Sequence, residues 1–152
     1  MITSYEYVLT RAPFVVRRRV RWSDCDPAGV VYTGKFTDYL LGAVHLFMSE
    51  LGGGHYSQWL ETLDVDTPCK GMELTFHHAL WPEDDCDLLC TIGAVRESSY
   101  DINVEARAVA GRPSAGTLVF SGRFSPVCIS RTVRKRVPIP AALLEALAAH
   151  RK

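Results

Sequence analysis

The alternation of apolar and polar residues near the beginning of the chain predicts a strand. Residues 14–22 read FVVRRRVRW, and their apolar members fall on one face: Phe14, Val16, Val20 and Trp22. The arginines at 17, 19 and 21 fall on the other face, because successive side chains of a strand point to opposite sides. Arg18 interrupts the apolar face. The segment is therefore expected to be a half-buried strand with solvated arginines.

A long apolar helix is expected over residues 34–51, GKFTDYLLGAVHLFMSEL, which the glycines at 52–54 terminate. Its apolar residues cover most of the helix circumference rather than one stripe. Such a helix that also carries Lys35, Asp38, His45 and Glu50 is typical of a globular core and not of a membrane span. His45 is expected to be packed inside, and other segments must wrap the helix.

Segments rich in Val, Ile, Phe, Leu and Thr follow near residues 70–81, 87–97, 99–110 and 116–130, and the turn signals WPEDD, ESS and GRPSAG separate them. The short ESS connection predicts an antiparallel hairpin. A second helix is expected from Pro140 to Ala149. Together these segments predict one α+β domain over residues 1–152, in which a curved antiparallel sheet surrounds a central helix.

Composition excludes several classes of protein. Seventeen basic and seventeen acidic residues give no net charge, which argues against a sequence-independent nucleic-acid partner. The five cysteines are odd in number and contain no CxxC pair, so no metal site or disulfide framework is expected. The N-terminus lacks the pattern of a signal peptide, and no run is apolar enough to predict a membrane partner. Reduced thiols in a cytoplasmic protein are the expectation.

The stretch SDCDPAGVVYTG at 23–34 carries the candidate chemistry. Pro27 holds Asp26 in extended conformation, and the helix is expected to begin at about Thr33 or Gly34. A helix start offers unpaired N–H groups and partial positive charge. A carboxylate beside such donors suits acyl transfer, because the donors hold the developing oxyanion while the carboxylate attacks or activates water. The alternative is an ordinary turn that Asp24 or Asp26 braces.

The pattern RVRWSDCDPAGVVYTGKFTDYL resembles the signature of the 4-hydroxybenzoyl-CoA thioesterase branch of the hot-dog superfamily. TPC, ALWPEDDCDLL, RESSYDI and VPIPAALLEAL follow in the order that this family shows, so the resemblance extends from about residue 14 to 147. It implies a hot-dog fold that hydrolyses acyl-CoA thioesters without metal or organic cofactor. It also implies self-association as a dimer or tetramer, with active sites between subunits.

Carried over by position, the resemblance implies Asp26 as the catalytic carboxylate and Thr33 and Gly34 as the amides that polarise the thioester carbonyl. It implies substrate-binding positions in two groups, one around the acyl group and one for the nucleotide: Asp24, Gly29, Tyr32 and Thr67, and then Arg96, Ser98, Lys135 and Arg136. Asp24 looks like a supporting residue. The run RTVRKR at 131–136 that contains the last two is also consistent with a solvated strand end.

The chain departs from the family pattern in two places. At the helix start it has Thr33-Gly34-Lys35-Phe36 instead of aromatic-Pro-Asn-Tyr. Leu41 stands where the 4-hydroxybenzoyl enzymes carry an acidic residue. Because leucine accepts no hydrogen bond from a phenol, a more apolar acyl or aryl group is expected.

Other candidate groups are weaker. Cys25 lies between two carboxylates, which disfavour a thiolate. His77 and His78 are expected in a strand, with one pointing inward. Glu61 and Glu73 are rival carboxylates, and the only glutamate of the long helix, Glu50, lies too close to its C-terminal end to reach its start. Asp26 therefore remains the preferred carboxylate. Two other functions stay open: hydrolysis of an acyl-carrier-protein ester, and a non-catalytic module that binds acyl-CoA.

Overall fold

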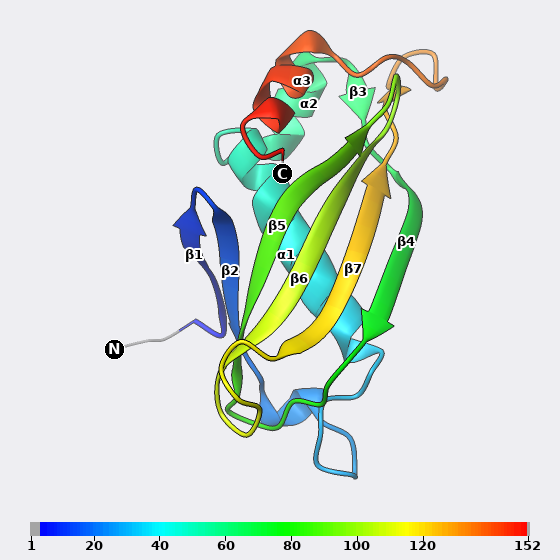
Figure 1. The fold of residues 1–152 in the computed structure, drawn as a ribbon. Helices are drawn as coiled ribbons and strands as arrows, with labels where there is room; N and C mark the ends of the chain where they lie inside the picture. Colours follow the sequence, from blue (N-terminus) through cyan, green and yellow to red (C-terminus); the bar gives the residue numbers. More distant parts are fainter. Residues whose placement is uncertain (1–3, 152) are drawn as a thin grey trace.

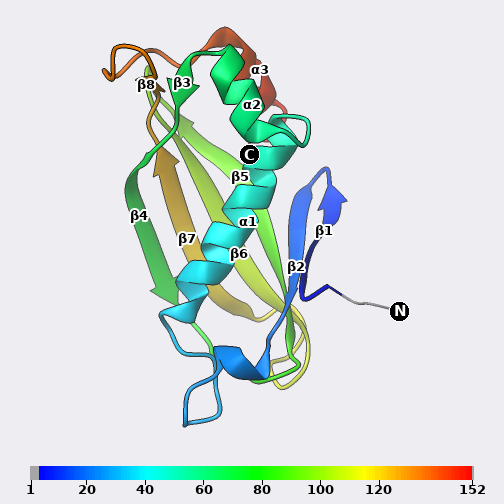
Figure 2. The same cartoon turned by 180° about the vertical axis from the view of Figure 1, so that it is seen from behind.

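The computed structural model describes residues 4–151, in which six antiparallel strands form one sheet with a long helix packed on one face (Figures 1 and 2). The strands of this sheet are β1 (Glu6–Arg11), β2 (Phe14–Arg19), β4 (Cys69–Phe76), β5 (Asp85–Val95), β6 (Tyr100–Ala110) and β7 (Leu118–Pro126). The helices are α1 (Lys35–Leu51), α2 (Tyr56–Thr62) and α3 (Ala141–Ala148). The predicted α+β architecture of a curved antiparallel sheet with a central helix is confirmed.

The strand order is β1-β2-β5-β6-β7-β4, so β4 and β1 form the two edges of the sheet. The predicted hairpin at ESS joins β5 to β6. The strand before it in sequence, β4, pairs with β7 rather than with β5. Residues 77–84 therefore cross one end of the sheet. A separate pair, β3 (Val65–Asp66) and β8 (Ile129–Ser130), lies at the opposite end.

Helix α1 packs on the sheet through the side chains that the sequence supplies on one flank. Phe36, Leu40, Val44 and Phe47 of α1 are buried. The expectation that the helix is wrapped on all sides was wrong, because Leu41 is 40% exposed. His45, expected to be packed, is also exposed. A single sheet covers only the flank that faces it, so the opposite flank stays open in one chain.

The two faces of the sheet differ sharply. Burial alternates along β5, where Leu88, Cys90 and Ile92 point to α1. The outer face carries ion pairs between neighbouring strands, such as Arg17 with Asp87 at 2.8 Å between Nε and Oδ1. The predicted solvated arginines of β2 are therefore paired with the aspartates of β5.

Some local expectations were wrong. Strand β2 ends at Arg19 and residues 22–24 form a 3-10 turn, so Trp22 is 85% exposed instead of buried. Strand β4 ends at Phe76, so His77 and His78 lie outside it and both are exposed. The sequence reading also missed β1 and α2. Among the described residues, none of the helices is long and apolar enough to cross a membrane.

Candidate active site

The DPAG stretch folds into a tight hairpin with Asp26 at its first corner. The N–H of Gly29 donates to the Asp26 carbonyl at 2.9 Å, and the Asp26 N–H donates to the Val30 carbonyl at 2.9 Å. Gly29 has φ of 84°, a conformation that favours glycine. The Asp26 carboxylate also accepts the Ala28 N–H at Oδ1, 2.9 Å away. The expected turn is therefore present, with Asp26 as its organising residue.

This turn uses only one oxygen of the Asp26 carboxylate. Within residues 4–151, no group donates a hydrogen bond to Oδ2 of Asp26. The residue is half-buried and lines a hollow of about 320 Å³ beside Trp22, Pro27 and Pro82. The second oxygen is thus available to act on a bound molecule.

Helix α1 begins at Lys35, close to the predicted start, with Gly34 as its N-cap. The N–H of Lys35 donates to the Tyr32 carbonyl at 2.8 Å, and that of Phe36 to the Thr33 carbonyl at 3.1 Å. In the described part of the chain, the N–H groups of Thr33 and Gly34 donate to no protein acceptor. They are two free donors at the positive end of the helix.

Tyr32 lies directly over this helix start. A Cβ atom added at Gly34 would come within 2.6 Å of Cε1 of the Tyr32 ring. Glycine at 34 therefore allows the ring to approach the backbone, and the ring remains largely exposed. The departure from the family pattern at this position has a local structural reason.

Asp24 is buried below the hairpin and is 4% exposed. Its Oδ2 accepts hydrogen bonds from the Tyr39 hydroxyl at 2.7 Å, from Nη2 of Arg18 at 3.0 Å and from the N–H of Arg21 at 3.0 Å. Burial would raise the pKa of Asp24, but these donors outweigh it and the pKa lies below its ordinary value. Asp24 is therefore an ionised carboxylate that ties segments together.

Thr67 does not join Asp26 in one chain. Its Oγ1 lies 2.7 Å from the hydroxyl of Tyr56 on α2, beside the C-terminal half of α1. Both residues line a hollow of about 520 Å³ together with His45 and Phe124. Asp26 lies near the beginning of α1, and a helix of 17 residues is about 25 Å long. Thr67 directly follows β3, which Figure 1 shows at the opposite end of α1 from the loop that precedes the helix.

The predicted nucleotide residues gather at the same end as Thr67. The Cys128 N–H donates to the Ser98 carbonyl at 2.7 Å, which ties the β5–β6 turn to the segment that leads to Lys135 and Arg136. Arg96 forms two hydrogen bonds with Asp101, at 3.0 and 2.9 Å. Lys135 and Arg136 are exposed. Neither side chain has an acidic partner within residues 4–151.

The RTVRKR run contains residues with different roles, which its sequence does not distinguish. Arg131 and Arg134 bind Asp66, with Nε and Nη1 each 2.9 Å from a carboxylate oxygen. Asp64 accepts a hydrogen bond from Thr132 at 2.9 Å. Because these contacts fix the loop, the run is more than a solvated strand end. The aspartates that hold it lie almost 70 residues away, where no sequence signal marked them.

Comparisons with known proteins agree with this arrangement. Residues 20–147 match the family model described as Thioesterase-like superfamily. A 1,4-dihydroxy-2-naphthoyl-CoA hydrolase from Microcystis aeruginosa is 24% identical over 126 residues, which cover 83% of this chain and 86% of that protein.

Two solved structures have the same fold. A thioesterase superfamily protein from Jannaschia sp. has a TM-score of 0.79 and 26% identity, over 100% of this chain and 99% of its own. A 1,4-dihydroxy-2-naphthoyl-CoA thioesterase from Synechocystis has a TM-score of 0.74 and 23% identity, over 89% and 95%.

The chain belongs to the thioesterase-like superfamily. The family model covers the hairpin, α1 and the whole of the sheet from β5 to β7, and the hot-dog fold that the sequence resemblance implied is confirmed. The expected reaction class, thioester hydrolysis, is the one that gives this family its name.

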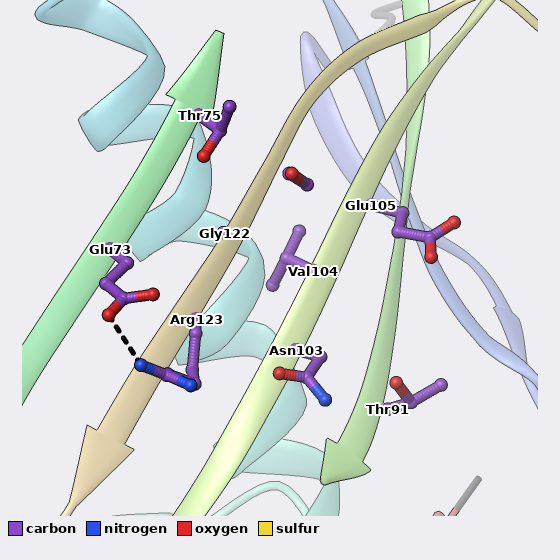
Figure 3. A pocket seen from close by; sticks show the side chains of 9 residues that line it. Glu73, Thr75, Thr91, Asn103, Val104, Glu105, Gly122 and Arg123 are labelled. Carbon is purple, nitrogen blue, oxygen red and sulfur yellow. Dashed lines mark ion pairs between the residues drawn. The ribbon is translucent and has the colours of Figure 1, made fainter.

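The rival carboxylates of this thioesterase-family chain are engaged elsewhere. Glu73 lies on the outer face of the sheet and pairs with Arg123 at 2.6 Å, in a shallow polar hollow that Asn103 and Glu105 also line (Figure 3). Glu61 pairs with Arg131 at 3.5 Å, and Glu50 pairs with Arg11 at 3.6 Å, far from the start of α1. None of these carboxylates reaches the free N–H groups at the helix start.

The cysteine between the two aspartates is also a poor nucleophile. Burial first, and then the charges of Asp24 and Asp26, raise the pKa of the Cys25 thiol. Its Sγ lies 3.7 Å from the Arg21 carbonyl. The thiol therefore stays protonated at neutral pH, as the sequence reading expected.

Proposed function

We propose that this protein hydrolyses an acyl-CoA thioester, with Asp26 as the essential carboxylate. The observation that carries the proposal is the pair of unused N–H groups at Thr33 and Gly34, beside a hairpin whose Asp26 keeps one carboxylate oxygen free. Donors aimed at a carbonyl oxygen and a carboxylate near its carbon are the two requirements of acyl transfer.

The reaction follows from these groups. The thioester oxygen accepts the N–H groups at the beginning of α1, which stabilise the negative charge that develops on it. Asp26 either attacks the carbonyl carbon, so that water must then hydrolyse the mixed anhydride, or removes a proton from water that attacks directly. Both routes release the thiolate of coenzyme A and a free acid.

A second copy of the chain completes the site in this proposal. Strand β4 is an edge strand whose outer side has no strand partner among the described residues. Near it, Met72, Phe76 and Leu41 are 40–47% exposed, an unusual amount for large apolar side chains. Antiparallel pairing of β4 with the same strand of a second copy, about a two-fold axis, covers these side chains.

That pairing also explains the separation of the candidate residues. A two-fold axis through β4 sets the Thr67 end of one copy beside the Asp26 end of the other. The hollow at Thr67 then takes the acyl group next to Tyr32, with Gly29 and Asp24 shaping the hairpin. Arg96, Ser98, Lys135 and Arg136 of the same end take the phosphates of coenzyme A.

The acyl group is an apolar or aryl one. Leu41 is exposed on the open flank of α1, on the side where the second copy packs, and offers no hydrogen bond to a phenol. The Microcystis and Synechocystis relatives act on an aryl thioester by their names. Aryl substrates of low polarity therefore belong in the first panel.

The test measures coenzyme A release from short, medium, long and aryl acyl-CoAs, for the wild type beside Asp26→Asn. The substitution keeps the shape and removes the charge, so turnover is expected to fall by about three orders of magnitude. Binding of the thioester, measured by calorimetry, is expected to survive. Near-normal turnover of Asp26→Asn contradicts the catalytic assignment.

The remaining functions are outcomes of the same experiment. If no acyl-CoA is turned over, acyl-carrier-protein esters are tested next. Hydrolysis of such an ester that free coenzyme A does not inhibit identifies the carrier-protein ester as the substrate. Binding of acyl-CoA without turnover of either ester identifies a non-catalytic module.

A further inference from the structure

The buried carboxylate of Asp24 connects three separate elements. Arg18 belongs to β2, Arg21 precedes the 3-10 turn and Tyr39 lies in the second turn of α1, yet all three donate to the same oxygen of Asp24. The guanidinium of Arg18 also lies over the Tyr39 ring, 4.4 Å from its centroid. Strand, turn and helix therefore meet at one atom.

The backbone of Asp24 reaches the other arm of the hairpin. Its carbonyl accepts the N–H of Tyr32 at 3.1 Å, and the adjacent Cys25 forms a bridge with Val31. Tyr32 directly precedes Thr33 and Gly34, the residues with free N–H groups. Asp24 therefore binds both arms of the hairpin that carries Asp26, and it binds the helix whose start carries the donors.

We infer that Tyr39 and Arg18 are positioning residues, which act through Asp24 to hold Asp26 in register with the first turn of α1. The inference rests on the proposed function, because it assumes that Asp26 and the helix start act on one substrate. Reacting groups must be held within about 0.5 Å of their productive geometry, and buried hydrogen-bonded residues behind them supply that constraint.

Stability alone gives a poor account of this cluster. Taking a carboxylate and a guanidinium out of water is costly, and apolar residues of similar volume often replace such a pair without loss of stability. The Arg18 side chain is 13% exposed and that of Asp24 is 3% exposed. Hydrogen bonds are directional, whereas apolar contacts are not. The ionic cluster therefore fixes the orientation of the hairpin relative to α1, which an apolar cluster would not do.

The test is Tyr39→Phe, which removes one hydroxyl and keeps the ring. We expect kcat to fall about tenfold while KM stays within about twofold, because the substrate still binds but the carboxylate is misplaced. A thermodynamic cycle with Asp24→Asn sharpens the result. If Tyr39 acts through Asp24, the double variant loses little more kcat than Asp24→Asn alone.

Phe47→Leu is the matched control. Phe47 is fully buried in the same helix, near the opposite end from the hairpin, and packs against Phe14 and His150. This variant is expected to lose stability and to keep kcat. Equal kcat losses in Tyr39→Phe and Phe47→Leu, at temperatures where both are folded, reduce the cluster to a structural role and overturn the inference.

The inference and the proposed function fail in different ways. Asp26→Asn with normal activity contradicts the proposed function. An inactive Asp26→Asn combined with an unchanged kcat in Tyr39→Phe leaves the function intact and contradicts the positioning role.

Discussion

Each end of the sheet holds an ion pair between a buried aspartate and an arginine, but the two arginines differ in their exposure to solvent. At the hairpin end Asp24 binds Arg18, whose side chain is 13% exposed. At the opposite end Asp101 binds Arg96, whose side chain is 45% exposed. The Arg18 guanidinium lies between Asp24 and the Tyr39 ring of α1, whereas nearly half of the Arg96 side chain stays in contact with solvent. The hairpin end is built for fixed geometry and the other end for exchange with solvent.

The comparison separates two requirements of a thioesterase. Chemistry at a carbonyl needs groups that do not move, and a buried carboxylate that accepts three hydrogen bonds provides a rigid support. Binding a phosphorylated nucleotide needs accessible cations, which lose less when they stay solvated until the ligand arrives.

The largest effect is expected from Asp24→Ala. The substitution leaves the mostly buried Arg18 guanidinium with only Glu6, 3.6 Å away, as an acidic partner, so the free energy of unfolding should fall by about 3 kcal/mol. Urea unfolding at pH 7 measures it. Asp101→Ala is the matched control at the opposite end, with an expected loss of about 1 kcal/mol because Arg96 can turn to water. Equal losses at the two ends contradict the comparison.

A smaller effect is expected from reversing both free charges of the opposite end, Lys135→Glu with Arg136→Glu. Because coenzyme A carries phosphates, KM for acyl-CoA should rise about tenfold while kcat is unchanged. The rise should shrink at high salt, which screens exposed charges. Arg134→Glu serves as the comparison variant. Because Arg134 already binds Asp66, this substitution should also lower the stability of the loop. A fall in kcat with unchanged KM shows that this end does not bind the nucleotide.

The smallest effect concerns acid stability. The Arg96 hydrogen bonds hold the pKa of Asp101 below its ordinary value, despite the opposing effect of burial. The stability that this bond contributes is fully present above the unfolded-state pKa of about 3.9, and it is lost as pH falls through the lower folded-state pKa. Asp101→Asn should therefore be less stable than the wild type by about 1 kcal/mol at pH 7, and the difference should narrow near pH 3. Chemical unfolding at both pH values measures it, and a difference that widens in acid has the wrong sign.

The sequence predicted the elements whose signals are local. The strands β5 and β6, the long helix α1 and the ESS hairpin were predicted correctly, because local composition, helical periodicity and turn residues act over a few positions. The reading failed where tertiary context decides. His45 and Leu41 have the composition of a buried helix, but one sheet can cover only one flank. His77 and His78 leave the strand because the chain must cross to β5 there.

The candidate site divides in the same way. Asp26, Thr33 and Gly34 lie within nine residues, so the motif and its resemblance to a known family located them before any coordinates. Tyr39 and Arg18 gave no such signal, because an ordinary helix tyrosine and an arginine on a strand acquire their role only from the buried oxygen that they share. The aspartates that hold the basic loop were invisible for the same reason.

The sequence by itself determined the family, the candidate motif and the order of the main elements, since each depends on residues that are neighbours in the chain. Only the tertiary structure decided which polar groups are already occupied and which are free. Among residues 4–151, no group donates a hydrogen bond to Oδ2 of Asp26, and no group accepts one from the N–H groups of Thr33 and Gly34. Asp24 and Arg96 are bonded. Whether a polar group has a hydrogen-bond partner depends on the distances between segments of the chain, and folding alone sets those distances.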